Sequence, residues 1–138
     1  MPQIREVMTK NPRTVKPDAS AAEAAKLMRD EDAGVVPITE GDGRLAGLVT
    51  DRDIALRVVA EGKDPGSTKV KEIASQNLVT VDPQQDLDEV LRLMAKHQVR
   101  RLPVVEEDGK LVGIVAQADV ARHTDAASTG QVVEQISE

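Results

Sequence analysis

The chain has 138 residues and contains no Phe, Trp, Tyr or Cys. Without aromatic side chains it lacks the platforms on which single-stranded nucleic acids stack. Its 18 basic and 24 acidic residues give a formal net charge of −6, which disfavours contact with phosphate backbones. The absence of Cys excludes disulfides, thiolate nucleophiles and thiolate-ligated metal sites. We therefore expect no nucleic-acid partner and no thiolate chemistry.

The charge distribution also disfavours a membrane span. The longest run without a charged residue is the nine residues 73–81, about half of what a spanning helix needs. The N-terminus does not have the pattern of a signal peptide. His97 and His123 are the two histidines, and no His-x-x-x-His pair exists, so no metal site is predicted. We expect a cytoplasmic protein without a membrane partner.

An internal repeat organises the chain. A shift of 66 residues places residues 4–57 on 70–123 without a gap, and 17 of the 54 pairs are identical. Such a register predicts a tandem duplication. The predicted parts are repeat 1 at 4–61, a linker at 62–69, repeat 2 at 70–123 and a tail at 124–138. In the tail, Val132, Val133 and Ile136 fit either one helical stripe or an interaction tail.

Each repeat begins with a short extended segment, at 13–15 and 79–81, that ends before a Pro. Asp18 and Asp86 then stand where a helix N-cap is expected. Apolar residues follow at i, i+3, i+4 and i+7, the period of an amphipathic helix. They are Ala21, Ala24, Ala25 and Met28 in repeat 1, and Leu87, Val90, Leu91 and Met94 in repeat 2. One helix is therefore predicted at each place.

Two apolar runs come next in each repeat, joined by a turn that contains Asp-Gly, a strong β-hairpin signal. The predicted strands are 35–39 and 45–50 in repeat 1, and 102–105 and 111–116 in repeat 2. A second helix is predicted from Asp51 to about Glu61, and its counterpart from Gln117 to about His123. Each repeat is thus β-α-β-β-α, an α/β (α+β) fold. Because helices cover one face of each small sheet, we expect the two repeats to pack sheet to sheet about a pseudo-twofold axis.

These motifs resemble a known family. The pattern is Glu-Val-Met-Thr, Thr-Val-x-Pro, a helix ending in Leu-Met, Leu-Pro-Val-Val, and Asp-Gly-x-Leu-x-Gly before a Val-Thr-Asp-x-Asp segment. It resembles the cystathionine-β-synthase-type (CBS) domain over residues 4–123, and two in tandem resemble a Bateman module. The resemblance implies a regulatory sensor that binds AMP, ADP or ATP, or else NAD(H) or S-adenosylmethionine, between the repeats. It also implies a homodimer that signals to a partner protein.

In this family, the segment Gly-hydrophobic-hydrophobic-Thr/Ser-x-x-Asp binds the ligand, and residues 47–53 contain it in full. The resemblance implies that Asp53 accepts hydrogen bonds from the ribose hydroxyls and that Thr50 contacts ribose or phosphate. A helix N-terminus at this point favours a phosphate. The same spacing also fits a capping box, with Thr50 at the N-cap and Asp53 at N3, which stabilises a helix without any ligand.

The resemblance implies that repeat 2 completes this site. Leu78, Val79 and Val99, together with Leu48, would surround the base, and the basic pair Arg100 and Arg101 follows Val99. An Arg guanidinium suits a phosphate because it donates two parallel hydrogen bonds. The same pair also fits a solvated turn before a buried strand.

The counterpart site, with Arg13, Ile114 and Asp119, is predicted to be weaker. Ala116 stands where the family has a hydroxyl, and Ala33-Gly34-Val35 supply no cation in place of the Arg pair. Losing one hydrogen bond to a charged group weakens binding by roughly tenfold to a hundredfold.

The sequence leaves two alternatives to nucleotide sensing. One is a scaffold that dimerises and docks a partner without any ligand, which the degraded second site favours. The other is an enzyme, which the sequence does not favour. Asp51 and Asp53 are two residues apart at a helix start, so they point in different directions and make a poor acid/base pair.

Overall fold

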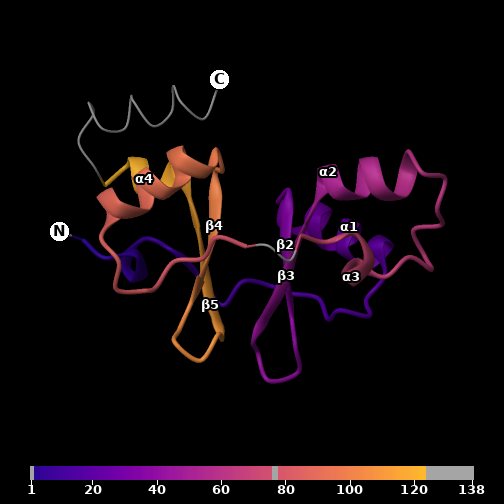
Figure 1. Ribbon diagram of the computed structural model, residues 1–138, viewed down its shortest axis with the longest axis horizontal. Helices are drawn as coiled ribbons and strands as arrows, with labels where there is room; N and C mark the ends of the chain where they lie inside the picture. The colour runs from indigo at the N-terminus through magenta and orange to yellow at the C-terminus, as the bar shows by residue number, and fades with distance from the viewer. Residues whose placement is uncertain (1, 76–77, 124–138) are drawn as a thin grey trace. The chain divides into compact units, whose positions relative to one another are not determined.

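The computed structural model describes residues 2–75 and 78–123 (Figure 1). The chain forms two compact units, which we call the middle unit, Arg13–Leu78, and the terminal unit, Met1–Pro12 with Val79–Glu138. Each unit combines helices with a small sheet, so the predicted mixed fold with two sheets is confirmed. The predicted tail, 124–138, lies outside the described residues. No helix in the described part of the chain is both long and apolar enough to cross a membrane.

In its described residues, the middle unit contains one hairpin and four helical segments. They are α1 (Ala21–Glu31), β2 (Val35–Thr39), β3 (Leu45–Thr50), α2 (Asp51–Ile54), the π-helical η2 (Ala55–Val59) and α3 (Val70–Ile73). Both strands have the predicted bounds and pair antiparallel. Gly43 takes φ +91° in the turn between them, a conformation that the predicted Asp-Gly turn requires.

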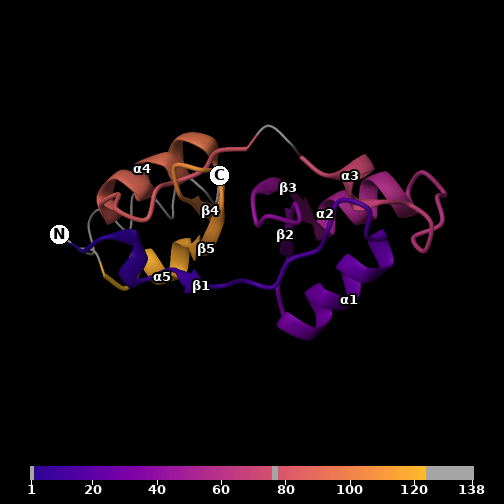
Figure 2. The same cartoon turned by 90° about the horizontal axis from the view of Figure 1, so that it is seen from below.

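The terminal unit has a three-stranded antiparallel sheet in the order β1-β5-β4. Its elements are the 3₁₀ helix η1 (Ile4–Glu6), β1 (Thr9–Lys10), α4 (Leu87–His97), β4 (Arg101–Val105), β5 (Leu111–Ala116) and α5 (Gln117–Ala121). Strand β1, which the sequence does not predict, lies along β5 (Figure 2).

The compact units do not coincide with the sequence repeats, because the first residues of each repeat pack with the other one. Ile4 is fully buried in the terminal unit, and its N–H donates to Gln85 O at 3.0 Å. At the equivalent place Val70 is fully buried in the middle unit, and its N–H donates to Ala19 O at 2.8 Å. Segment 62–69, predicted as the linker between repeats, lies inside the middle unit.

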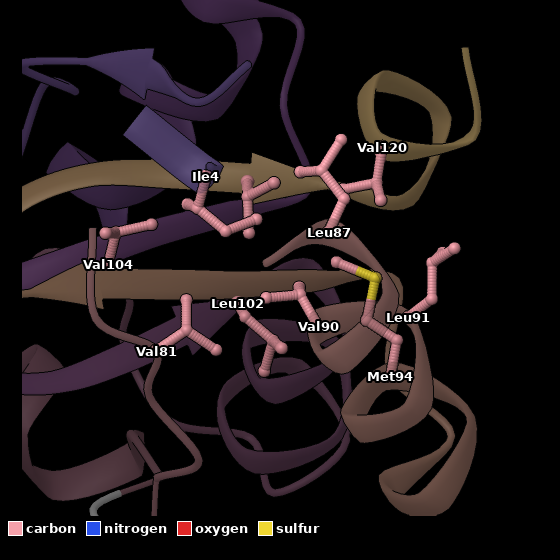
Figure 3. Packing of buried hydrophobic residues seen from close by; sticks show 10 residues of the cluster. Ile4, Val81, Leu87, Val90, Leu91, Met94, Leu102, Val104 and Val120 are labelled. Carbon is pink, nitrogen blue, oxygen red and sulfur yellow. The ribbon is translucent and has the colours of Figure 1, made fainter. Parts of the chain in front are cut away.

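Each unit has its own apolar core. In the terminal unit, α4 contributes the predicted stripe Leu87, Val90, Leu91 and Met94, all buried against β4, β5 and Val120 (Figure 3). In the middle unit, α1 buries Ala21, Ala24, Leu27 and Met28. Ala25 is exposed, so its predicted core position is wrong and Leu27 takes that role.

The starts of the first helices differ from the prediction. Ser20, not Asp18, is the N-cap of α1, and its Oγ accepts from Glu23 N at 3.1 Å. Asp86 is the N-cap of α4, but its side chain makes no capping bond. The extended segments at 13–15 and 79–81 do not form strands. Each makes one parallel bridge, Val15 with Ile38 and Val81 with Val104.

Candidate functional site

The end of β3 and the start of α2 hold the most complete part of the predicted site. Asp53 N donates to Thr50 Oγ1 at 3.0 Å, and Thr50 N donates to Asp53 Oδ2 at 2.9 Å. This reciprocal capping box is one of the two interpretations of the Thr50–Asp53 spacing, and the structure contains it. Asp53 Oδ1 receives no hydrogen bond from a described residue, and the side chain is half-buried. One carboxylate oxygen is therefore oriented by the fold and still able to accept.

Leu48 lies two residues before Thr50 on the same strand. Its N–H donates to Ser75 O at 3.2 Å, and its carbonyl accepts from Ser75 N at 3.1 Å. Its side chain is half-buried. Leu78, also half-buried, ends the middle unit. Strand pairing and capping thus fix the backbone of Leu48, Thr50 and Asp53.

The remaining residues of the predicted first site belong to the terminal unit. Val79 and Val99 are half-buried against its core. Arg100 and Arg101 are exposed, and Arg100 O accepts from Gln117 N at 2.7 Å. The two guanidinium groups form no ion pair with a residue of the described ranges. They are thus available to an anion, and their backbone is tied to the start of α5.

The residues of the weaker predicted site are already partnered. Arg13 Nη1 pairs with Glu31 Oε1 at 3.2 Å, and the Asp119 carboxylate pairs with Arg122. Ile114 is half-buried in β5, opposite Thr9 and Pro103. The sequence interpretation missed the Asp119–Arg122 pair, although an i, i+3 spacing of opposite charges is a visible signal for it.

The start of α5 also lacks the cap that α2 has. Ala116 stands at its N-cap and offers no side-chain acceptor. Gln117 Nε2 is buried and has no hydrogen-bond partner among the described residues, and no sequence signal marks that amide. A buried donor without a partner is unfavourable. The polar groups at the start of α5 therefore have fewer hydrogen-bond partners than those at the start of α2. No group of three His, Cys, Asp or Glu side chains able to hold a metal ion occurs in the described ranges.

Comparison with known proteins decides the family. The model of the CBS domain matches residues 4–60 and again 70–125. The chain belongs to the CBS domain family. This tandem CBS pair is 46% identical over 121 residues to the CBS domain-containing protein YhcV of Bacillus subtilis, covering 88% of this chain and 84% of YhcV. It is 39% identical over 136 residues to Hypoxic response protein 1 of Mycobacterium tuberculosis, covering 99% and 94%.

Solved structures share the fold of this CBS pair. Hypoxic Response Protein I, crystallised with two coordinated zinc ions, has a TM-score of 0.82 and 40% identity, covering 90% of this chain and 100% of its own. CBSX2 in complex with AMP has a TM-score of 0.76 and 26% identity, covering 88% and 94%. The CBS domain pair of MJ0100, in complex with 5′-methylthioadenosine and S-adenosyl-L-methionine, has a TM-score of 0.79 and 29% identity, covering 89% and 95%.

Proposed function

We propose that this CBS pair is a regulatory module, not an enzyme, that binds an adenine nucleotide of the AMP, ADP or ATP class between its repeats. The observation that carries the proposal is the capping box of Thr50 and Asp53, which leaves Asp53 Oδ1 without a partner among the described residues. A carboxylate fixed in this way suits the ribose hydroxyls, which donate hydrogen bonds. Solved CBS pairs in complex with AMP and with S-adenosyl-L-methionine support the ligand class.

The proposed ligand contacts are those that the family resemblance implies. Leu48, Leu78, Val79 and Val99 surround the base, while Arg100 and Arg101 bind the phosphates. Because the chain has no aromatic residue, aliphatic side chains hold the base and strand backbone reads its edge. Selectivity then rests more on the ribose and the phosphates than on the base.

We infer one strong site per chain. Asp119 is paired with Arg122, Arg13 is paired with Glu31, and Ala116 offers no hydroxyl, so the second site is weaker. A ligand that binds two packings of the repeats unequally shifts their populations, and a partner protein can read that shift as a difference in affinity.

Isothermal titration with AMP, ADP and ATP tests the proposal. We expect one site per chain, and a loss of tenfold or more in affinity for Asp53→Asn, because hydrogen bonds to a charged group contribute about 1.5–3 kcal/mol. Asp119→Asn, the matched control in the other repeat, should leave that affinity within about twofold. Thermal unfolding of each variant checks that the fold is kept. No heat with the wild type, or unchanged affinity in Asp53→Asn, would refute the proposal.

One observation favours a second candidate, a scaffold that dimerises and docks a partner. Leu56 and Val59, on the helical segment after the capping box, are 48% and 70% exposed. Neighbouring exposed apolar side chains suit a protein interface. Sedimentation velocity should detect a homodimer that Val59→Asp weakens. A scaffold without a ligand would keep its dimer and give a flat thermal-shift screen over adenosine-containing compounds.

A further inference from the structure

A cavity lies entirely within the terminal unit. Its volume is about 800 Å³, and it is lined by the N-terminal segment, the loop before α4 and the turn of the β4–β5 hairpin. Pockets for small molecules typically measure about 300–1,000 Å³. None of the residues proposed for the nucleotide lines this cavity.

Backbone hydrogen bonds fix the three segments to one another. Arg5 N donates to Pro83 O at 3.0 Å, which joins the N-terminal segment to the loop. Val105 N donates to Val81 O at 2.9 Å, which joins the loop to β4. Lys10, on β1, is paired with Gly113 of β5. The backbone of the walls is therefore in place before any ligand arrives, which lowers the entropic cost of binding.

Charges of opposite sign come from different walls of this cavity. The N-terminal segment supplies the cations Arg5 and Lys10, and the loop and the turn supply carboxylates, among them Asp82, Glu106 and Glu107. Neither Arg5 nor Lys10 forms an ion pair with a carboxylate in the described part of the chain. Met8, Pro83 and Val112, all half-buried, give the cavity an apolar surface.

The middle unit has an equivalent but smaller cavity, and the cation in its lining is already paired with a carboxylate. Its equivalent cavity measures about 320 Å³ and includes Lys71, which corresponds to Arg5 across the 66-residue repeat. Lys71 Nζ pairs with Asp18 Oδ1 at 2.9 Å, and this hydrogen bond raises the pKa of Lys71. In the terminal unit, Gln84 stands at the position equivalent to Asp18. Lys71 of the middle-unit cavity therefore has an ion-pair partner, whereas Arg5 of the terminal-unit cavity has none among the described residues.

We propose that the terminal-unit cavity binds a free aliphatic α-amino acid. The ligand's carboxylate takes the place at Arg5 and Lys10 that Asp18 takes at Lys71, since an Arg guanidinium binds a carboxylate with two parallel hydrogen bonds. Its ammonium group is held by the carboxylates of the loop and the hairpin turn, and its side chain lies on Met8, Pro83 and Val112. A simple anion is disfavoured because carboxylates outnumber cations in the lining, and a simple cation would leave Arg5 and Lys10 without a partner in the cavity.

Titration of the full chain with L-leucine and L-methionine tests this site. N-acetyl-L-leucine lacks the ammonium group and L-leucinamide lacks the carboxylate, so we expect the free amino acids to bind and both derivatives to bind at least tenfold more weakly. Equal binding of N-acetyl-L-leucine would show a simple anion site, and equal binding of L-leucinamide a simple cation site. Either result would overturn the proposal, as would the absence of binding at millimolar concentrations.

Variants at equivalent positions of the two units give the controls. Arg5→Gln should weaken L-leucine binding about tenfold or more, whereas Lys71→Gln should leave it unchanged. Gln84→Asp should also weaken it, because it gives Arg5 the partner that Lys71 already has. Unchanged affinity in Arg5→Gln, with the fold verified by circular dichroism, would refute the assignment. Asp53→Asn should leave L-leucine binding intact, so a failure of the nucleotide proposal is distinguishable from a failure of this one.

Discussion

The same hairpin and following helix occur in both units, but the side chains at the start of that helix differ. In the middle unit Thr50 and Asp53 cap α2 reciprocally. In the terminal unit Ala116 offers no cap, and Asp119 turns to Arg122 instead. The backbone has been kept while the side chains at the helix start have diverged. The two copies of a duplicated fold can thus diverge. One copy keeps a carboxylate oriented by a capping box, and in the other copy the equivalent carboxylate pairs with an Arg.

The largest expected effect concerns the strand β1, which pairs with β5 beside Gly113. A Cβ on Gly113 would lie 2.6 Å from Met8 Sδ and 2.8 Å from Thr9 O, whereas a Cβ on the equivalent Gly47 would lie 3.0 Å from Ser75 O. Gly113→Ala should lower the free energy of unfolding by about 1–3 kcal/mol, as overpacking does. Gly47→Ala should cost less. Urea unfolding of both variants measures the difference, and an equal or reversed order would show that β1 shifts freely.

A smaller effect concerns the two helix starts. Thr50→Ala removes the cap of α2 and should cost about 0.5–2 kcal/mol of unfolding free energy. Ala116→Thr places a hydroxyl at the equivalent position of α5, three residues before Asp119, and should stabilise the protein by up to about 1 kcal/mol. Thermal and urea unfolding check both. If Ala116→Thr destabilises the protein, the Asp119–Arg122 pair is worth more than a capping box at this place.

The hairpins and the α4 stripe were predictable because their signals are local. Asp-Gly turns between apolar runs predict a hairpin directly, and the bulky residues of α4 leave one face to bury. In the Ala-rich α1 the small side chains do not distinguish a buried face from an exposed one. The pattern therefore predicts a core position for Ala25, which is exposed. The exchange of the repeats' first residues, Ile4 and Val70, depends on contacts distant in the sequence, which periodicity does not encode.

In the candidate site, too, the sequence predicts the local contacts but not the long-range ones. Thr50 and Asp53 lie three residues apart, and their contact follows from spacing. The partners of Arg13 and Asp18 lie farther along the chain, on α1 and around the start of α3, so the sequence did not reveal them. The position of Asp18 after Pro17 predicts an N-cap of α1, but its carboxylate instead contacts Lys69 and Lys71.

The smallest expected effect concerns this ion pair, which the middle unit has and the terminal unit lacks at Gln84. The side-chain hydrogen bond from Lys71, with the charge of Lys69, lowers the pKa of Asp18 below its usual 3.8. A lowered pKa in the folded state means that the stabilisation is fully present above pH 3.8 and is lost as the pH falls through the folded-state pKa.

The stability difference between wild type and Asp18→Asn should therefore be small but measurable by urea unfolding at pH 7, and should shrink as the pH falls below 3.8. It should also shrink in high salt, because the pair is exposed and screened. Gln84→Asn, at the equivalent position of the terminal unit, removes no titrating group, so its effect should not vary with pH in this way. A difference for Asp18→Asn that stays constant down to pH 2 would mean that the contact acts through packing and not through charge, which would remove the electrostatic distinction between the two cavities.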